Sequence, residues 1–265
     1  MQFDEMGNTA GKVLFLLPGT ACDYQTNFAA VLDRLAEKYH LVCVNYDGFD
    51  GSDLIFPDMI TVTEKIERYI QDNYGGRIDG AIGSSLGSSF VGQLIQRQNV
   101  HLDHGIFGSP DLDQSRRLSA WLQSKLVVPL LTGFTKNEKK KAKTKEKLKG
   151  IFEMSDEAAD KFMACFEKFS PESIRNEYYT DLLTWLKDDI LVEHTKVHST
   201  LSPHPIRQGF EQLVVVIREP QSFQGASYLP LAQRGDSRFV DIRKLSSLHK
   251  APPLASPLRS GGKST

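Results

Sequence analysis

The sequence predicts an α/β fold in which a doubly wound, mostly parallel sheet carries an inserted block of helices. Over the first 110 residues, short continuous apolar runs alternate with helical patterns, and such runs are typical of strands buried on both faces. Parallel strands bring their carboxyl ends to one edge of the sheet, and ligands of such folds bind outside that edge. Beyond residue 110 the alternation stops, and helical periodicity continues to about residue 206.

Four apolar runs are predicted strands, and helical patterns separate them. The strands are expected at Val13–Leu17, His40–Asn45, 78–82 and 104–108, with helices at 24–39, 62–73 and 88–98. In the first of these helices, the apolar residues Phe28, Val31 and Leu35 recur on one face. The alternation of strand and helix predicts helices on both faces of the sheet.

The most informative motif is Gly83-Ser84-Ser85-Leu86-Gly87, which lies between a predicted strand and a predicted helix. Its G-x-S-x-G pattern is that of a nucleophile elbow, a sharp turn that holds the central serine in a strained conformation above the sheet. A Cβ atom at Gly83 or Gly87 would collide with the neighbouring strand or helix. The N-terminus of the following helix also favours negative charge that develops at Ser85. The alternative is a serine-rich helix N-cap in an ordinary strand-to-helix turn.

A second turn, Pro18-Gly19-Thr20-Ala21, follows the first predicted strand at the spacing expected of an oxyanion loop. Small residues suit such a loop because its backbone N–H groups must reach the reacting carbonyl without obstruction. The first donor is expected to be the amide of Thr20, with Ala21 as the alternative, and the second donor the amide of Leu86. The other interpretation is a plain strand-to-helix turn.

These segments, LFLLPGTACD, VNYDGFDGSD and AIGSSLGSS, resemble the α/β-hydrolase superfamily in their order and spacing. Pro18 stands where many members have a histidine before the oxyanion glycine, a difference that concerns the subfamily. The resemblance covers residues 13–110. It implies a serine hydrolase in which Ser85 attacks an ester or related acyl carbon of a small-molecule substrate while the Thr20 and Leu86 amides hold the oxyanion. It also implies that no metal or organic cofactor is needed.

The same resemblance implies an acid and a histidine later in the chain, in the order Ser, acid, His. A β-branched run at 213–217 predicts a strand, and Glu219 is the first carboxylate after it. An alternating run at 238–242 predicts a further strand, and His249 follows it. His249 would take the proton of the nucleophile, and Glu219 would fix its tautomer.

Two features of this half differ from the family pattern. Arg218-Glu219-Pro220 replaces the usual Gly-x-x-Asp turn, and Leu248 replaces the usual glycine before the histidine. Asp236 is therefore a competing acid. Asp241 is a poorer one, because it lies within a predicted strand.

The domain organisation follows from these patterns. The hydrolase core is expected at 1–110 and 207–250, with a helical cap at 111–206 that covers the site, and packing helices remote from the site are the alternative. Residues 251–265 read APPLASPLRSGGKST, a composition rich in proline, serine and glycine that predicts a disordered tail.

Composition excludes several classes of function. The formal net charge of −1 gives no general attraction to nucleic acid, and no apolar run is long enough to span a membrane. The polar start and three cysteines without disulfide spacing predict a cytoplasmic protein, with Cys43 as a small core residue. The lysine run at 136–149 predicts a solvated helix face or a mobile cap loop, with attraction to an anionic surface as the alternative. The sequence makes no prediction of oligomeric state.

Three other functions remain open on this sequence. One is another reaction on the same scaffold, such as acyl transfer, thioester hydrolysis or carbon–carbon bond hydrolysis. The second is a hydrolase-fold binding protein with impaired catalysis. The third is a different doubly wound protein that binds phosphate at 83–89, although a G-x-G-x-x-G fingerprint and a P-loop lysine are both missing.

Overall fold

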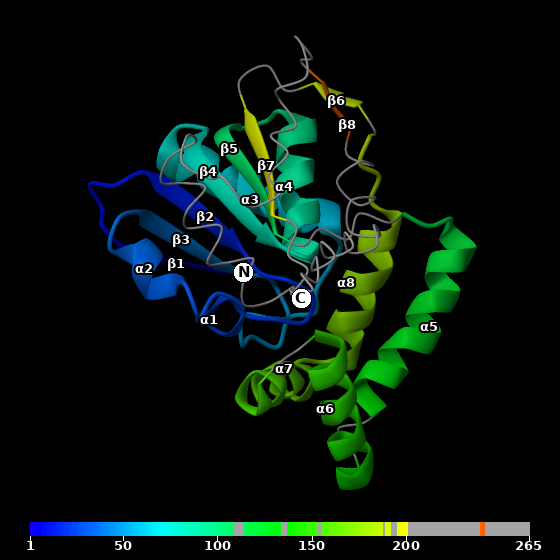
Figure 1. Cartoon of the computed structure of the whole chain (residues 1–265). Helices are drawn as coiled ribbons and strands as arrows, with labels where there is room; N and C mark the ends of the chain where they lie inside the picture. The colour runs from blue at the N-terminus through cyan, green and yellow to red at the C-terminus, as the bar shows by residue number, and fades with distance from the viewer. Residues whose placement is uncertain are drawn as a thin grey trace, which may run out of the picture.

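The computed structural model describes residues 1–108, 114–133, 137–152, 155–187, 189–191, 195–200 and 239–241. Its centre is a six-stranded sheet with helices on both faces, and a group of further helices lies beside the sheet (Figure 1). The strand order is β1-β3-β2-β4-β5-β7, and every neighbouring pair is parallel except β1 with β3. The predicted fold class, a mostly parallel α/β sheet, is confirmed.

The strands of the large sheet are β1 (Gln2–Gly7), β2 (Val13–Leu17), β3 (His40–Asn45), β4 (Arg77–Ser84), β5 (His101–Gly108) and β7 (Lys196–Thr200). A second, two-stranded sheet joins β6 (Asp189–Leu191) to β8 (Phe239–Asp241) in antiparallel register. The helices are α1 (Tyr24–Asn27), α2 (Leu32–Ala36), α3 (Met59–Tyr74), α4 (Leu86–Arg97), α5 (Arg117–Gly133), α6 (Glu138–Phe152), α7 (Asp156–Lys168) and α8 (Pro171–Leu183).

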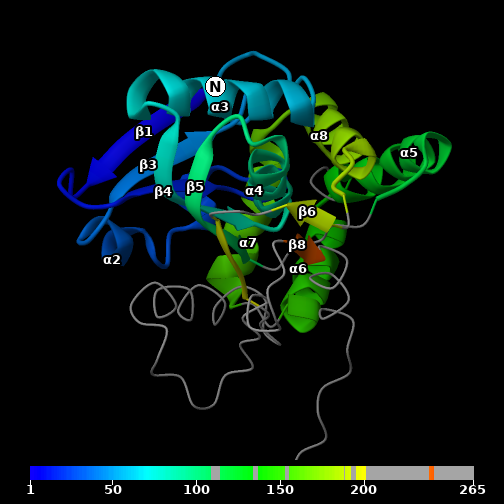
Figure 2. The same ribbon diagram turned by 90° about the horizontal axis from the view of Figure 1, so that it is seen from above.

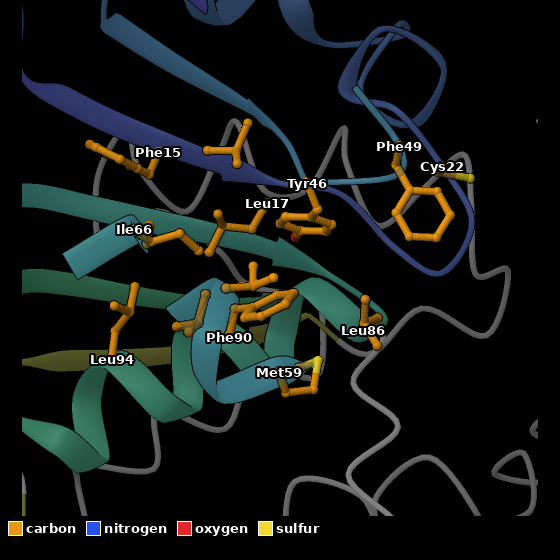
Figure 3. Close-up of a cluster of buried hydrophobic side chains, with 14 of the residues drawn as sticks. Phe15, Leu17, Cys22, Tyr46, Phe49, Met59, Ile66, Leu86, Phe90 and Leu94 are labelled. Atoms are coloured by element: carbon orange, nitrogen blue, oxygen red, sulfur yellow. The ribbon is translucent and has the colours of Figure 1, made fainter. Parts of the chain in front are cut away.

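The core has two parts because successive residues of a strand point to opposite faces of the sheet. On β2, Phe15 and Leu17 pack with side chains of α3 and α4, among them Ile66 and Phe90 (Figure 3). Leu14 and Leu16 face the other way. They pack against side chains of α1 and α2 and of the segment that joins these two helices. In the view from above, α3 and α2 accordingly lie on opposite sides of the sheet (Figure 2). The prediction that Val13–Leu17 is buried on both faces is confirmed.

The helix predicted at 24–39 is divided into α1 and α2. Asp23 caps α1 by accepting a hydrogen bond from the Thr26 amide, and α2 begins without a side-chain cap. Phe28 and Val31 lie between the two helices and are fully buried. The apolar residues at helical spacing are therefore buried as predicted, although the backbone between α1 and α2 is not helical.

The strand β1 was not predicted, because its sequence is polar. It is an edge strand, and its residue Glu5 accepts hydrogen bonds from Tyr69 at 2.7 Å and Tyr74 at 2.8 Å. The ring of Phe3 stacks on Tyr69 with centroids 3.8 Å apart. Side-chain contacts with α3 thus hold β1 in place, although its sequence lacks the apolar run that would predict a strand.

The predicted cap segment, 111–206, contains α5 to α8 but also two strands. Of these, β7 pairs in parallel with β5 and extends the large sheet, so the predicted boundary at residue 206 lies too far along the chain. Val197 is the only apolar residue of β7, which explains why no strand was predicted there. The alternating run at 238–242 does form a strand, β8, but in the two-stranded sheet.

The lysine-rich segment forms α6, an exposed helix that pairs with α7. Lys141 lies 2.6 Å from Glu167, and Lys145 lies 2.7 Å from Asp160. The interpretation as a solvated helix face is confirmed for 138–149. In the described part of the chain, no helix combines the length and the apolar character needed to cross a membrane.

Candidate functional site

The backbone of Ser85 has a conformation that non-glycine residues rarely adopt. Its φ is 50° and its ψ is −115°, and it joins the end of β4 to the start of α4. Among described non-glycine residues, only Ala21 and Gln98 share a positive φ. Such a conformation costs about 1–3 kcal/mol and persists only where surrounding structure enforces it. The predicted strain at this turn is confirmed.

The two glycines of the motif allow three backbone segments to touch. A Cβ atom on Gly83 would overlap the carbonyl of Gly87, and one on Gly87 would overlap the carbonyl of Leu17 at the end of β2. The hydroxyl of Ser88 also donates to the Gly83 carbonyl at 3.1 Å. The elbow is therefore pressed against the adjacent strand, as the sequence predicted, and any side chain at either glycine would open it.

The loop after β2 borders Ser85. A Cβ atom on Gly19 would lie 3.1 Å from the Ser84 carbonyl oxygen and 3.4 Å from the Ser85 Cβ. The Gly19 amide donates to the Asn27 side chain at 2.7 Å, which turns this peptide toward α1. The loop at 18–21 and Ser85 are therefore neighbours in the structure, whereas their joint role in one site stays a prediction.

The sequence left the amides of Thr20 and Ala21 open as the first oxyanion donor, and the two differ in their hydrogen bonds. The Ala21 amide donates to the Glu177 carboxyl oxygen Oε2 at 2.9 Å, and Ala21 has a φ of 53°. The Thr20 amide makes no hydrogen bond with any described residue, and Leu86, as the first residue of α4, has no acceptor within the helix. Among the described residues, the Thr20 and Leu86 amides therefore have no hydrogen-bond acceptor, and their role as oxyanion donors stays a prediction.

Glu177 was missed by the sequence analysis. It lies on α8, is fully buried, and its second oxygen, Oε1, has no hydrogen-bond partner in the described part of the chain. Burial raises the pKa of Glu177 well above its usual value; the Ala21 N–H opposes this shift, and Asp181 adds to it. The available signal was spacing, because Glu177 follows the buried residues Ser173 and Ile174 by four and three positions.

Tyr46 supports the same loop from the core. Its hydroxyl donates to the Pro18 carbonyl at 3.0 Å, and its ring lies 4.7 Å from that of Phe90 on α4. Figure 3 shows Tyr46 between Leu17 and Phe49 at the ends of β2 and β3. Burial raises the pKa of the Tyr46 hydroxyl, so that this side chain acts as a neutral donor.

Helix α8 lies across the carboxyl ends of β2 and β3. Besides the bond from Ala21 to Glu177, the Phe56 amide donates to the Ser173 hydroxyl at 3.2 Å, and Asn176 donates to the Phe56 carbonyl at 3.1 Å. These contacts join α8 to the loops that follow both strands. At least this helix of the predicted cap therefore contacts the loop that borders Ser85.

The remaining predicted site residues, Glu219 and His249, and the competing acid Asp236 lie outside the described residues. Among the histidines that the structure describes, His40 and His101 are the first residues of their strands, and His104 lies in the first half of β5. The fourth, His198, is in the middle of β7, where its Nε2 lies 3.0 Å from the Nδ1 of His104. All four are therefore placed away from the turn at Ser85.

The position of β7 changes the argument for the acid. The strand beside β5 ends at Thr200, and the further strand predicted at 213–217 lies outside the described residues. The first carboxylate after Thr200 is Glu211, ahead of Glu219 and Asp236. Glu211 is therefore a further candidate beside the predicted acid Glu219 and its competitor Asp236, and the identity of the acid stays a prediction.

The three cysteines are all buried. Cys43 is buried in the core, as predicted, and Cys22 in the loop after β2 is buried beside Cys165 of α7. In the described ranges, no three metal-binding side chains cluster. The predicted absence of a cofactor remains a prediction.

Solved structures share this architecture at low sequence identity. A protein from Desulfitobacterium hafniense, described as of the α/β-hydrolase family, is 14% identical over 82% of this chain and 85% of that chain, with a TM-score of 0.59. A thermophilic esterase from Thermogutta terrifontis is 15% identical over 80% and 79% of the two chains, with a TM-score of 0.59. MenH from S. aureus is 14% identical over 80% and 83%, with a TM-score of 0.56.

No protein-family model matches the sequence, and no curated protein matches it. At the identities found, likeness to solved structures demonstrates the fold, and the chemistry has to be argued from the residues themselves.

Proposed function

Because the chain has the α/β-hydrolase fold, we propose that it is a serine hydrolase that cleaves an ester or related acyl bond of a small substrate through an acyl-enzyme on Ser85. The observation that carries this proposal is the strained backbone of Ser85, enforced by Gly83 and Gly87. A strained non-glycine residue at the end of a central strand is typical of a nucleophile elbow, whereas an N-cap serine needs no strain.

The first half of the reaction uses groups that lie around this turn. The Ser85 hydroxyl attacks the substrate carbonyl carbon, and the carbonyl oxygen becomes an oxyanion that accepts hydrogen bonds from the Thr20 and Leu86 amides. Leu86 begins α4, whose N-terminus also stabilises negative charge. Loss of one such donor typically raises the barrier by about 3 kcal/mol.

The second half requires a base and an acid. We assign the base to His249, which removes the proton of Ser85 and passes it to the leaving group, and then deprotonates the water that releases the acyl group. Glu219 is the proposed acid, with Asp236 and Glu211 as competitors. The remote positions of the four described histidines support the choice of a histidine further along the chain.

The helical segment supplies the substrate pocket in this proposal. Its helix α8 reaches the loop beside Ser85 through Glu177 and the loop after β3 through Asn176, so residues on this side of the sheet are placed to contact an acyl or leaving group. Acyl transfer, thioester hydrolysis and carbon–carbon bond hydrolysis would use the same serine, and substrate profiling distinguishes them.

The test of this function is labelling of Ser85. We expect a fluorophosphonate probe to modify Ser85 and the protein to hydrolyse p-nitrophenyl butyrate. Ser85→Ala should abolish both reactions, whereas the matched control Ser84→Ala should retain them. Modification of Ser84 in the Ser85→Ala variant, or no modification of a folded parent protein, would refute the proposal.

A further inference from the structure

Among the described residues of α8, only Glu177 forms a hydrogen bond with the backbone of the loop beside Ser85. Its Oε2 accepts the Ala21 amide at 2.9 Å, although the two residues are 156 positions apart in the chain. We propose that Glu177 is a positioning residue of the reaction. By holding the Ala21 amide, it orients the N–H group of the preceding residue, Thr20, toward the substrate oxyanion. This inference rests on the proposed function.

The geometry of the loop needs such a contact. Ala21 has a φ of 53°, a left-handed conformation that is unfavourable for a residue with a side chain. A buried amide without an acceptor would destabilise this loop further. Since Ala21 is fully buried, Glu177 supplies the acceptor that water cannot provide.

Three side chains hold the loop, and they come from different elements. Asn27 accepts the Gly19 amide, and Tyr46 donates to the Pro18 carbonyl. Both belong to the core, whereas Glu177 belongs to the helix that lies across the strand ends. Glu177 is thus the contact through which the position of α8 determines the direction of the loop amides.

Glu177 performs this role as an uncharged group. Among the described residues, the titratable groups that face it are Asp181 on its own helix, Cys22 in the loop and Tyr46 after β3, and none of these three carries a positive charge. Burial, the largest cause, raises the pKa of Glu177 well above its usual value, while the Ala21 N–H lowers it. Since Oε2 accepts the Ala21 amide, Oε1, which has no partner in the described part of the chain, is the oxygen free to carry a proton.

Protonation has a consequence for catalysis. A neutral carboxyl group beside the oxyanion loop does not oppose the negative charge of the transition state, whereas a carboxylate would repel it. Activity should therefore decline as the pH rises through the pKa of Glu177. A glutamine at this position retains the acceptor oxygen and removes the ionisation.

The experiment compares Glu177→Gln, Glu177→Ala and the exposed control Glu172→Gln on the same helix, using p-nitrophenyl butyrate. We expect Glu177→Ala to lower kcat about 100-fold with little change in KM. Glu177→Gln should recover at least tenfold of that loss and should lack the parent's decline in kcat/KM above the pKa of Glu177. The control should keep both the rate and the pH profile of the parent.

Two results would overturn the proposal. One is a folded Glu177→Ala variant whose kcat is within threefold of the parent. The other is a Glu177→Gln variant that keeps the parent's decline in kcat/KM above the pKa of Glu177. Circular dichroism and urea unfolding establish that each variant is folded, and a Glu177→Ala variant that does not fold leaves the pH profile of Glu177→Gln as the deciding measurement.

A measurement of the amide itself separates this inference from the proposed function. Hydrogen exchange at Ala21 should be fast in Glu177→Ala and slow in the parent and in Glu177→Gln. Failure of Ser85 to react with the fluorophosphonate probe refutes the hydrolase. Unchanged Ala21 exchange in Glu177→Ala refutes the positioning contact, whether or not the protein hydrolyses esters.

Discussion

The amide of Ser85 donates a 2.7 Å hydrogen bond to the carbonyl of Gly108, the last residue of β5. The candidate nucleophile is therefore fixed by the strand next to its own as well as by the two glycines of its motif. Gly108 itself has little free space, because a Cβ atom there would lie 3.0 Å from the Gly83 carbonyl oxygen. Two adjacent strand ends thus determine the direction of the turn.

Substitution of Gly87 by alanine should severely destabilise the protein. The new Cβ would overlap the Leu17 carbonyl, and backbone atoms cannot move aside cheaply. We expect a loss of at least about 3 kcal/mol in the free energy of unfolding, measured in urea. The control is Gly150→Ala on α6, where no atom lies within 4 Å and alanine should stabilise the helix by about 1 kcal/mol. Equal stabilities of the two variants would contradict the packing described for the elbow.

Replacement of Ser85 by glycine should stabilise the fold relative to Ser85→Ala. Glycine adopts a φ of 50° without strain, whereas alanine retains the strain of serine. We expect the glycine variant to be more stable than the alanine variant by about 1 kcal/mol in urea unfolding. The result would count against a strained turn if the alanine variant were the more stable of the two.

The pair of His104 and His198 should make the protein sensitive to acid. Burial is the main cause that lowers both pKa values, and it lowers that of His198 from 6.5 to about 4. In this pH range the unfolded chain binds protons that the folded chain does not, so stability is full above pH 6.5 and is lost as the pH falls toward 4.

Between pH 7 and pH 5 the expected loss is about 2 kcal/mol, at 1.36 kcal/mol per unit of pKa. His198→Gln should reduce this loss in urea unfolding experiments, because glutamine does not titrate. An identical pH dependence in the variant and the parent would show that this pair does not control acid stability.

The assignment of the acid and the base predicts a specific pattern of activity. His249→Ala should lower kcat for p-nitrophenyl butyrate by about 10³-fold or more without a change in the free energy of unfolding. Among Glu211→Gln, Glu219→Gln and Asp236→Asn, we expect Glu219→Gln to cause a comparable loss and the other two to retain most activity. If Glu211→Gln or Asp236→Asn caused the largest loss instead, the role of acid would belong to that residue. A fully active His249→Ala variant would disprove the proposed base.

The parts of the fold that sequence predicts well are those whose cause is local. Val13–Leu17 and His40–Asn45 have the predicted bounds, since both strands are almost entirely buried and their apolar runs are continuous. The elbow was predictable because its strain requires glycines at fixed positions beside Ser85.

What the sequence did not predict depends on partners distant in the chain. β7 is recognised only by its pairing with β5, because Val197 alone gives no strand pattern. Glu177 resembles any helical glutamate until its partner Ala21 is known. The proposals for Glu219 and His249, and the disordered tail predicted at 251–265, lie outside the described residues and stay predictions.

The close contact between Gly87 and the Leu17 carbonyl also bears on how the site forms during folding. β2 and β4 pair in parallel across more than sixty intervening residues, for example at Leu17 with Gly83. The elbow and the loop beside it therefore come together only after this long-range pairing, which is among the slow events of folding. During refolding, reactivity of Ser85 toward an active-site probe should accordingly return with the native core and not with the earlier formation of single helices.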